Sequence, residues 1–440
     1  MSAPEKYPIL WWTLAYDSDR YDKQIINNCG LPYSCMMTLD RSYYEQSPLV
    51  IFHAWQIPRD DHIEKNDFPS KDEVRSGKKA WVLNTVESPM GIMRDKELTQ
   101  LFSYRWTNWL NADFVEHYFT IAPGIHSLIS KVLQPPLKTL EEKNALRKRG
   151  PEGPDGQPSR PLAPVAWIVS NCDSFNGRHY YVYQLLKFVD IDIFGKCIPT
   201  QSWPVNADGK ELEAIEVVSQ YKFYLSLENS NCDDYVTEKL ERAYEAGAIP
   251  IVDGPANYAR FDATGNALIK LDDFSSPKQL GKYINKLDGD DKLYLERLRY
   301  KIPKDPHHKP NTKDLSRAFL RTWYNSGNDS DWGPDWRGAQ CGVCELTHDL
   351  KEGIVQLDEA KHIGIDKTCI FKKHHHPLWV MEYHWRVTLS IMLAVAFVLY
   401  VLSRKPVRVF LLGIINSVLP QSWVHRYSHL TQNESLPMRE

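Results

Sequence analysis

Residues 223–239 read FYLSLENSNCDDYVTEK and carry the most informative pattern in the sequence. The segment opens on an apolar run typical of a buried strand, and residues 228–234 are polar and typical of a loop. Residues 235–246 continue with helical spacing, and Gly247 is well placed to end that helix. The run AIPIV at 248–252 predicts the next strand. A strand, a helix and a strand in this order predict two parallel strands.

The preceding sixty residues repeat this arrangement. PVAWIVS at 164–170 predicts a strand, 171–177 a loop and 178–189 a helix, and IDIF at 191–194 predicts another strand. Two β-α-β units in succession predict a parallel sheet of the Rossmann type, which binds ligands at the carboxyl ends of its strands.

The first third of the chain predicts a separate α/β domain. PILWWT at 8–13, PLVIF at 48–52 and AWVLNTV at 80–86 each indicate a buried strand. A stretch rich in Pro, Gly and charged residues follows, which is typical of a linker or exposed loop. The predicted division is a Rossmann-like lobe at 1–134, a linker at 135–163, a second Rossmann-like lobe at 164–346, a stem at 347–384, a transmembrane helix at 385–403 and a tail at 404–440.

Charge and cysteine content narrow the class of protein. Lys and Arg number 53 against 56 Asp and Glu, so the net charge is -3. Without a basic excess to neutralise phosphates, the chain is not expected to bind nucleic acid. Its eight cysteines are an even number, compatible with disulfides in an oxidising compartment and equally with free buried thiols.

One apolar segment near the end predicts membrane attachment. Residues 387–402 are uncharged, with Trp385 at one border and Arg404 and Lys405 beyond the other. This flanking pattern favours a membrane span whose C-terminal side is cytoplasmic, and the alternative is a buried core helix. The N-terminus lacks the shape of a signal peptide, so the targeting signal of a lumenal catalytic domain would be either missing or unconventional.

Several side chains around the loop at 228–234 could bind a nucleotide. Lys239 lies near the start of the predicted helix and could neutralise a phosphate, while Glu238 could accept hydrogen bonds from sugar hydroxyls. Tyr235 could stack on the nucleotide, and Asn229 and Ser230 belong to the same loop. Spacing alone favours a simpler interpretation, in which this is a solvated helix face.

The wider sequence favours the nucleotide-binding interpretation, because residues 7–346 closely resemble α1,3-fucosyltransferases. The longest matches are FYLSLENSNCDDYVTEKL at 223–240 and AGAIPIVDGPANYARF at 246–261, which resemble the family's donor-binding signature. Other matches follow in the expected order: PILWW at 8–12, DRSYYEQSPLVIFHAW at 40–55, WVLNTVESP at 81–89, SYR at 103–105, VAWIVSNCDSFNGR at 165–178, DIFGKC at 192–197, DDFSSPK at 272–278 and CGVC at 341–344.

The resemblance implies an architecture and a reaction. These enzymes have the GT-B fold of two Rossmann-like lobes with a cleft between them, and they transfer fucose from GDP-fucose with inversion and without a catalytic metal. It assigns the general base to Glu87 and a donor diphosphate contact to Arg178, with Arg105 as a weaker candidate for the cleft. Many relatives carry another arginine where this chain has Tyr180, which leaves one donor contact in doubt.

The resemblance also bears on the remaining motifs. It implies that Cys341 and Cys344 form disulfides, whereas a lone C-x-x-C is weak support for zinc. Asn328 opens an Asn-x-Ser sequon and is a candidate for N-glycosylation. Solvated or structural roles are expected for the Asp-x-Asp pairs at 190–192, 288–290 and 329–331 and for the histidines at 374–376, so no metal site is predicted.

The favoured function is therefore an α1,3-fucosyltransferase of the Golgi membrane, with a lumenal catalytic domain that transfers fucose to a GlcNAc-containing glycan of glycoproteins. One alternative keeps the donor GDP-fucose but modifies a protein hydroxyl. A second is a non-catalytic glycan- or nucleotide-binding protein. The presence of Glu87, Arg178, Glu238 and Lys239 together argues against this second alternative, because a protein without activity would have no need of all four.

Overall fold

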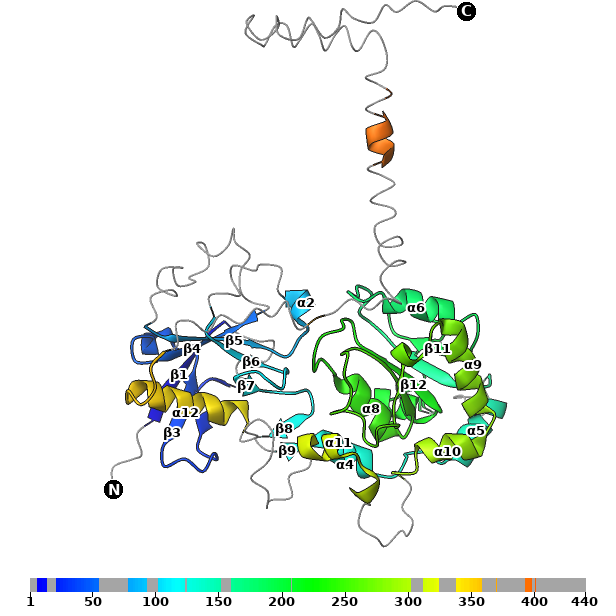
Figure 1. Ribbon diagram of the computed structural model, residues 1–440, viewed down its shortest axis with the longest axis horizontal. Coiled ribbons are helices and arrows are strands. Elements are labelled where there is room, and N and C mark those ends of the chain that lie inside the picture. Colours follow the sequence, from blue (N-terminus) through cyan, green and yellow to red (C-terminus); the bar gives the residue numbers. More distant parts are fainter. Residues whose placement is uncertain are drawn as a thin grey trace, which may run out of the picture. The chain divides into compact units, whose positions relative to one another are not determined.

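The fold is given by a computed structural model, shown in Figure 1. It describes residues 6–13, 21–54, 78–92, 102–122, 125–151, 160–206, 208–301, 312–323, 338–357, 369, 392–397 and 400. Asn328, the pair at 329–331 and the histidines at 374–376 lie outside these residues.

The first sheet contains seven strands and confirms the three predicted in this part of the chain. Its order is β2-β3-β1-β4-β5-β6-β7, and every pair is parallel except β2 with β3. The strands are β1 (Lys6–Thr13), β2 (Ile25–Ile26), β3 (Ser34–Thr38), β4 (Leu49–His53), β5 (Ala80–Thr85), β6 (Tyr104–Thr107) and β7 (Phe114–Val115).

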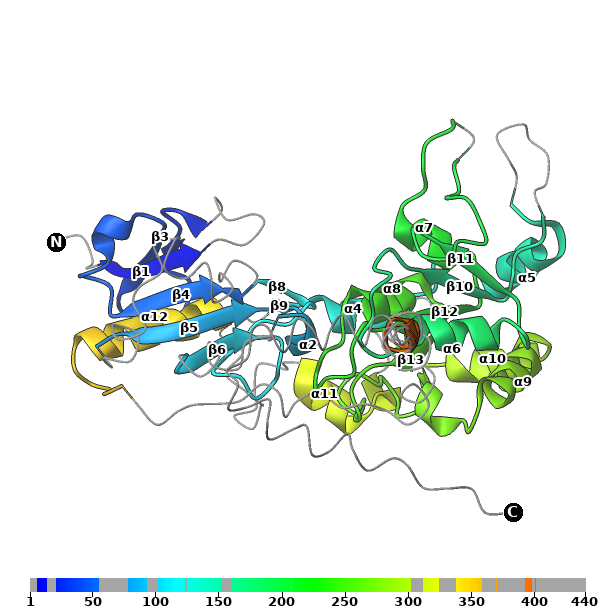
Figure 2. The same cartoon turned by 90° about the horizontal axis from the view of Figure 1, so that it is seen from above.

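The second sheet has five parallel strands in the order β11-β10-β12-β13-β14. Helices cover both faces, because apolar residues of α6 and α9 join one core and those of α7 and α8 join the other. Figure 2 shows α7 and α5 on one side of β10 and β11, with α6 and α9 on the opposite side. The elements are β10 (Val165–Ile168), α6 (Arg178–Leu185), β11 (Ile191–Phe194), α7 (Ala214–Ser219), β12 (Phe223–Leu227), α8 (Glu238–Ala246), β13 (Ile249–Asp253), β14 (Ile269–Lys270), α9 (Pro277–Asp288) and α10 (Asp291–Arg297).

The strand order of the second sheet creates a switch point beside β10. The chain leaves β10 toward β11 on one side and later returns to β12 on the other. At such a point the loops that follow the two strands diverge and leave a crevice, where open α/β sheets bind their ligands. The loop after β10 comprises residues 169–177, and the loop after β12 comprises residues 228–237. The second loop and the start of α8 contain most of the predicted donor-binding residues.

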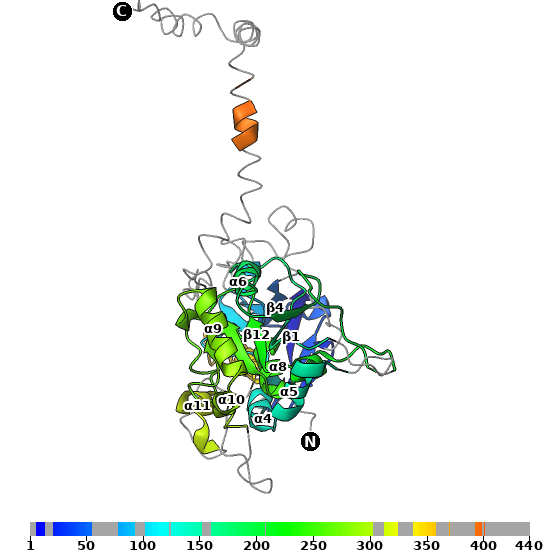
Figure 3. The same cartoon turned by 90° about the vertical axis from the view of Figure 1, so that its right-hand side faces the viewer.

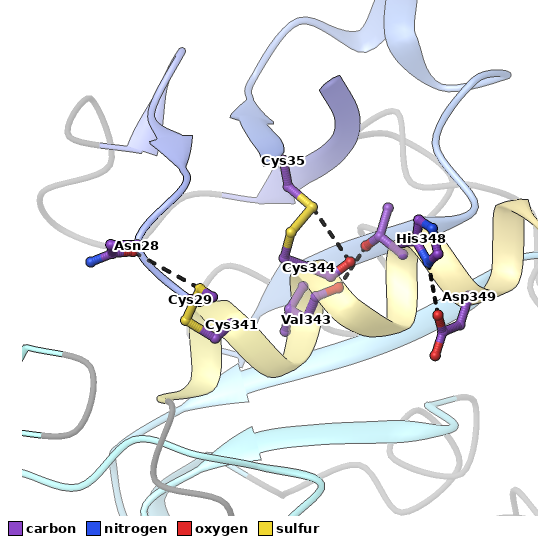
Figure 4. Close-up of a disulfide and its surroundings, with 9 residues drawn as sticks. Asn28, Cys29, Cys35, Cys341, Val343, Cys344, His348 and Asp349 are labelled. Carbon is purple, nitrogen blue, oxygen red and sulfur yellow. Dashed lines mark hydrogen bonds and ion pairs between the residues drawn. A yellow bond between two sulfur atoms is a disulfide. The ribbon is translucent and has the colours of Figure 1, made fainter. Parts of the chain in front are cut away.

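The helix α12 (Ala339–Lys351) corrects the predicted boundary between the lobes. Ala339 and Val343 pack in the core of the first sheet, and Figure 1 shows the helix beside β1 and β3. The disulfides Cys29–Cys341 and Cys35–Cys344 attach it there, as Figure 4 shows. Both cysteines therefore form disulfides as predicted, but 339–346 was wrongly assigned to the second lobe and 347–351 to an irregular stem.

The predicted linker at 135–163 is also partly wrong, because it contains the helix α5 (Leu140–Arg149). A capping box between Thr139 and Glu142 begins this helix. Its Lys143 is buried and donates hydrogen bonds to the carbonyls of Tyr221 and Gly247, at 3.0 and 2.6 Å. The charged sequence around Lys143 did not indicate this burial, because its carbonyl partners lie 78 and 104 residues further along the chain.

The helices that precede and follow the second sheet pack on α8. Leu128 and Val132 of α4 (Ser127–Leu133) join the core formed by α8 and α11 (Arg317–Trp323). The predicted first lobe at 1–134 included these residues, so its boundary was placed too late in the chain. Figures 1 and 2 show α4 beside α8 and close to α11, and Figure 3 shows the same end of the molecule along its long axis. The shorter elements are α2 (Pro89–Ile92), the hairpin β8 (Thr120–Ala122) with β9 (Ile125–His126), and single turns at Arg41–Tyr43, Leu271–Asp273 and Thr312–Asp314.

Among the residues that the structure describes, no helix has the length and apolar character needed to cross a membrane. Of the predicted span at 385–403, only 392–397 and 400 are described. The rest of that segment, and the tail at 404–440, lie outside the described residues.

Candidate active site

Glu87 lies two residues beyond the end of β5, on a turn that side chains hold at both ends. The Glu87 amide donates a hydrogen bond to Oγ1 of Thr85 at 3.0 Å. The next residue, Ser88, accepts a hydrogen bond from the amide of Met90 at 3.2 Å and so begins α2. Both contacts fix the backbone on either side of Glu87, whose side chain is partly buried. The carboxylate is thus presented at the carboxyl end of the first sheet.

Glu87 meets the predicted donor-binding segment through Tyr235. The Tyr235 hydroxyl donates a hydrogen bond to Oε2 of Glu87 at 3.2 Å, which links residues 148 positions apart. Tyr235 itself is buried. Burial, followed by the charges of Tyr118, Glu228 and Glu87, raises the pKa of Tyr235 well above its ordinary value. The hydroxyl therefore keeps its proton and remains a donor to Glu87.

Tyr118 is a member of the cluster that the sequence did not reveal. Its ring lies edge-on to that of Tyr235, with 6.3 Å between centroids. Burial raises the pKa of Tyr118 most, and the charges of Glu87, Glu228 and Glu238 raise it further. Three carboxylates from both sheets therefore lie close enough to act on one hydroxyl. No motif marked Tyr118, because its partner is distant in the sequence.

Glu228, directly after β12, was assigned only to a loop, yet it organises the start of α8. It is fully buried, and its Oε1 accepts hydrogen bonds from the Thr237 amide at 2.8 Å and the Thr237 hydroxyl at 3.0 Å. The Lys239 ammonium lies 3.1 Å from Oε2 of Glu228. Because these contacts hold Thr237 in an extended conformation, α8 begins at Glu238 and not at the predicted residue 235.

Lys239 and Glu238 form the exposed side of this charge cluster. The ammonium of Lys239 lies 3.3 Å from Oε1 of Glu238 and donates to Oγ1 of Thr237 at 2.7 Å. Burial by itself would lower the pKa of Lys239, but the carboxylates of Glu228 and Glu238 outweigh it and the pKa is raised. For Glu238, burial raises the pKa, but the charge of Lys239 and the hydrogen bond from Thr237 lower it by more, so the pKa lies below its ordinary value. Lys239 therefore stays cationic and Glu238 anionic at neutral pH.

Arg178 begins α6, as predicted, and joins the carboxyl ends of the two strands at the switch point. Its side chain is buried, and it donates hydrogen bonds to the carbonyl of Leu227 at 2.7 Å and to that of Asn171 at 3.0 Å. Burial lowers the pKa of Arg178, against the charge of Glu228. Two of its nitrogens thus support the loops, while Nε is a buried donor with no hydrogen-bond partner among the described residues.

The two loops at the switch point are also joined directly. Asn176 donates from its side-chain amide to the carbonyl of Glu228 at 2.9 Å and to Oδ1 of Asn231 at 2.8 Å. The Asn229 carbonyl accepts a hydrogen bond from the Phe175 amide at 2.7 Å, and Asn229 Oδ1 accepts from Ser230. Nδ2 of Asn231 is a second buried donor with no partner in the part of the chain described. Asn229 and Ser230 therefore line the same loop junction as Arg178.

Arg105, the weaker cleft candidate, lies within the first lobe. It is buried on β6, its amide donates to Oδ2 of Asp113 at 2.8 Å, and its guanidinium lies over the Trp109 ring at 4.4 Å. Burial lowers the pKa of Arg105, partly offset by Asp113. No hydrogen bond or ion pair joins Arg105 to the described residues of the Glu87–Tyr235 cluster.

The described Asp-x-Asp pairs have structural partners. Asp192 accepts hydrogen bonds from the Ala163 amide at 3.0 Å and the Tyr221 hydroxyl at 2.9 Å. Asp288 pairs with Arg147 at 2.7 Å and with Lys222 at 3.3 Å, and Asp290 caps α10. Within the described residues, no group of three His, Cys, Asp or Glu is placed to hold a metal ion.

A cavity of about 300 Å³ lies at the amino ends of β10 and β11, and neither Glu87 nor Tyr235 is among the residues that line it. Its wall contains Arg147, Arg160 and Asp192, and Arg160 and Asp192 form an ion pair. Charged side chains that neutralise one another at the amino ends of the strands do not match the ligand site expected of this sheet.

Two family models match the chain. "Glycosyltransferase family 10 (fucosyltransferase) C-term" covers residues 159–352, and "Fucosyltransferase, N-terminal" covers residues 4–119. Among solved structures, the chain is similar to a crystal structure of α1,3-fucosyltransferase with GDP-fucose, at 17% identity and a TM-score of 0.45, over 81% of this chain and 94% of that one.

Curated relatives of two kinds match as well. GDP-fucose protein O-fucosyltransferase 3 of Xenopus tropicalis is 30% identical over 72% of this chain, and the match spans 63% of that relative's length. Alpha-(1,3)-fucosyltransferase 4 of Mus musculus is 32% identical over 67% of this chain and 69% of the relative, and alpha-(1,3)-fucosyltransferase B of Drosophila melanogaster is 28% identical over 76% and 71%. The chain therefore belongs to glycosyltransferase family 10, the fucosyltransferases.

Proposed function

We propose that this chain transfers fucose from GDP-fucose to an acceptor hydroxyl with inversion, and that its two lobes form the GT-B arrangement. The observation that carries the proposal is the hydrogen bond between Tyr235 and Glu87, which joins the carboxyl end of the first sheet to the donor-binding segment of the second. A base and a nucleotide site on opposite sides of one junction are what a single displacement requires.

Glu87 is the proposed general base. Tyr235 occupies Oε2 of its carboxylate, which leaves Oε1 to accept the proton of the acceptor hydroxyl. As that proton moves to Glu87, the acceptor oxygen forms a bond to the anomeric carbon of fucose. The bond from that carbon to the diphosphate breaks at the same time, and GDP leaves with the electron pair. Attack opposite the leaving group inverts the anomeric configuration.

The leaving diphosphate is proposed to lie at the switch point of the second sheet. Lys239 supplies a positive charge there, and the unpartnered Nε of Arg178 and Nδ2 of Asn231 supply buried donors. Hydrogen-bond donors that are already in place stabilise charge as it develops on the departing phosphate. Glu238, which is the more exposed carboxylate, is suited to accept hydrogen bonds from sugar hydroxyls. These cations and donors are proposed to act without a catalytic metal.

The acceptor proposed first is a GlcNAc-containing glycan, in line with the relatives named alpha-(1,3)-fucosyltransferase. A protein hydroxyl is the second candidate, and the relatives named GDP-fucose protein O-fucosyltransferase 3 favour it. Four disulfides use all eight cysteines, which fits an oxidising compartment, and we extend the proposal to the Golgi lumen.

The test is a transfer assay with purified full-length protein and GDP-fucose. Its acceptor arms are N-acetyllactosamine and core GlcNAc glycans on one side and folded, unmodified protein domains on the other. NMR of the product's anomeric proton reports inversion. Glu87→Gln is expected to abolish transfer while calorimetry still detects GDP-fucose binding, and Glu211→Gln, at an exposed position, is the matched control.

Donor binding without transfer to any acceptor would favour the non-catalytic alternative. Unchanged turnover in Glu87→Gln would remove Glu87 from the mechanism.

A further inference from the structure

The disulfide Cys232–Cys369 connects the donor-binding segment to a part of the chain beyond the family models. Its two cysteines are 137 residues apart, and Cys369 lies after residue 352, where the C-terminal model ends. The backbones of Cys232 and Cys369 also form an antiparallel bridge. A residue outside the family domain is therefore attached, by a covalent bond and by its backbone, to the centre of the proposed site.

Cys232 begins the turn that places Tyr235. It is buried, and its carbonyl accepts a hydrogen bond from the Tyr235 amide at 3.1 Å. Its sulfur lies 3.6 Å from the hydroxyl of Ser88, the residue after Glu87. Since a disulfide sulfur carries no hydrogen, Ser88 is the donor in this contact. The turn that holds Tyr235 and the turn that holds Glu87 therefore touch at Cys232 as well as through the two side chains.

The same turn contains a residue in an unfavourable conformation. Asp234 has a φ of 56°, in the left-handed region that non-glycine residues rarely adopt. Its carboxylate accepts a hydrogen bond from the Leu110 amide at 3.0 Å, and its carbonyl lies 3.1 Å from Nε2 of His117. A backbone of this kind persists only where its surroundings hold it in place. The disulfide restrains the turn at Cys232, two residues before Asp234, while Tyr235 follows directly after Asp234.

We infer that the Cys232–Cys369 disulfide is a positioning element of the transfer site, which keeps Tyr235 in hydrogen-bonding contact with Glu87. This inference rests on the proposed function for its kinetic consequences. Loss of the disulfide frees the turn to relax at Asp234, and the Tyr235 hydroxyl then leaves Glu87. Donor binding changes less, because Lys239 and Thr237 are held separately by Glu228.

The first experiment compares full-length Cys369→Ser, Cys232→Ser and the double variant. Each is expected to lower kcat about tenfold, because small displacements of positioned groups are costly in catalysis. The three variants should be equal, since either substitution removes the same bond. The Kd for GDP-fucose should stay within about twofold. Cys29→Ser with Cys341→Ser is the matched control: it removes a different disulfide, while Cys35–Cys344 still holds α12.

A double-mutant cycle with Tyr235→Phe separates positioning from a general loss of stability. If the disulfide acts through the Tyr235 hydroxyl, Cys369→Ser should have less than about a twofold effect on kcat in the Tyr235→Phe background. A full tenfold effect there, or a kcat of Cys369→Ser within about twofold of the unmodified protein, overturns the inference.

Hydrogen exchange provides a readout that does not depend on transfer activity. The Tyr235 amide, which donates to the Cys232 carbonyl, should exchange faster in Cys369→Ser than in the unmodified protein. Equal exchange at Tyr235 overturns the inference even if the protein proves to have another activity. Absence of transfer in the unmodified protein contradicts the proposed function alone. The exchange measurement still shows whether the Cys232–Cys369 disulfide holds the turn at Tyr235 in place.

Discussion

The hydroxyl of Tyr235 donates a hydrogen bond to Oε2 of Glu87 at 3.2 Å, and the two residues follow strands of different sheets. A hydrogen bond to a charged group contributes about 1.5–3 kcal/mol. Tyr235→Phe removes the donor while it keeps the ring that packs against Tyr118. We expect kcat to fall about tenfold or more. Steady-state kinetics at saturating GDP-fucose would measure this, and an unchanged kcat would show that the contact does not orient the base.

Lys239 is expected to bind the donor diphosphate. Lys239→Met should raise the Kd for GDP-fucose about tenfold or more, because a charge-assisted contact is lost. The substitution also leaves the buried carboxylate of Glu228 without its cation, which by itself destabilises a protein by about 3–5 kcal/mol. The variant Glu228→Gln with Lys239→Met removes both charges and should recover stability without recovering affinity. Calorimetry and thermal unfolding together distinguish the two effects, with exposed Lys286→Met as the control.

Gly254 lies directly against Glu228, and its lack of a side chain matters there. A Cβ atom at residue 254 would lie 2.6 Å from the Tyr258 hydroxyl and 3.2 Å from Cγ of Glu228. Gly254→Ala should therefore destabilise the protein by about 1–3 kcal/mol and weaken GDP-fucose binding by displacing Glu228 from Lys239. Gly289→Ala is the control, because a Cβ there meets its nearest atom at 3.4 Å. Equal unfolding temperatures for the two variants would contradict this account.

Buried Lys143 predicts a stability that rises with pH. Burial, followed by the nearby charges of Lys222 and Lys138, lowers the pKa of Lys143 from 10.5 to about 7. Between these values the unfolded chain binds a proton that the folded chain does not, so the free energy of unfolding increases with pH by about 1.4 kcal/mol per unit. Unfolding of Lys143→Met, followed from pH 7 to 10, should show a shallower rise than that of the unmodified protein. Exposed Lys148→Met, on the same helix, should keep the original slope.

Chelation tests the expectation that catalysis needs no metal. Positive charge for the departing diphosphate is proposed to come from Lys239 and Arg178, so transfer should continue at its full rate in excess EDTA. A rate that falls on chelation and returns with added manganese would contradict this. The transfer assay with GDP-fucose, run with and without EDTA, measures this rate.

The sequence predicted the parts of the fold that depend on local pattern. Apolar runs predicted β4, β5 and β11 closely, and Gly247 ends α8 with a φ of 67°, as its position suggested. It also directed attention to the segment that contains Tyr235 and Lys239. Strand periodicity and helix caps are short-range signals, and for this reason they can be read from neighbouring residues.

The sequence did not predict what depends on distant contacts. Tyr118 reaches Tyr235 from over a hundred residues away, and Glu228 was one acidic residue among many until its burial was known. The assignment of α12 to the second lobe failed because residue order suggested continuity, whereas apolar contacts and two disulfides return that helix to the first sheet.

The return of α12 constrains how the protein is made. Cys29 and Cys35 find their partners 312 and 309 residues later, at Cys341 and Cys344. Nearly all of the second lobe is therefore synthesised before either disulfide can form. The thiols of Cys29 and Cys35 remain unpaired through most of translation. Oxidation during that interval would pair these thiols with the wrong cysteines. Correct folding thus depends on late oxidation or on repeated disulfide exchange. An enzyme that isomerises disulfides would therefore matter more for this chain than one that only speeds their formation.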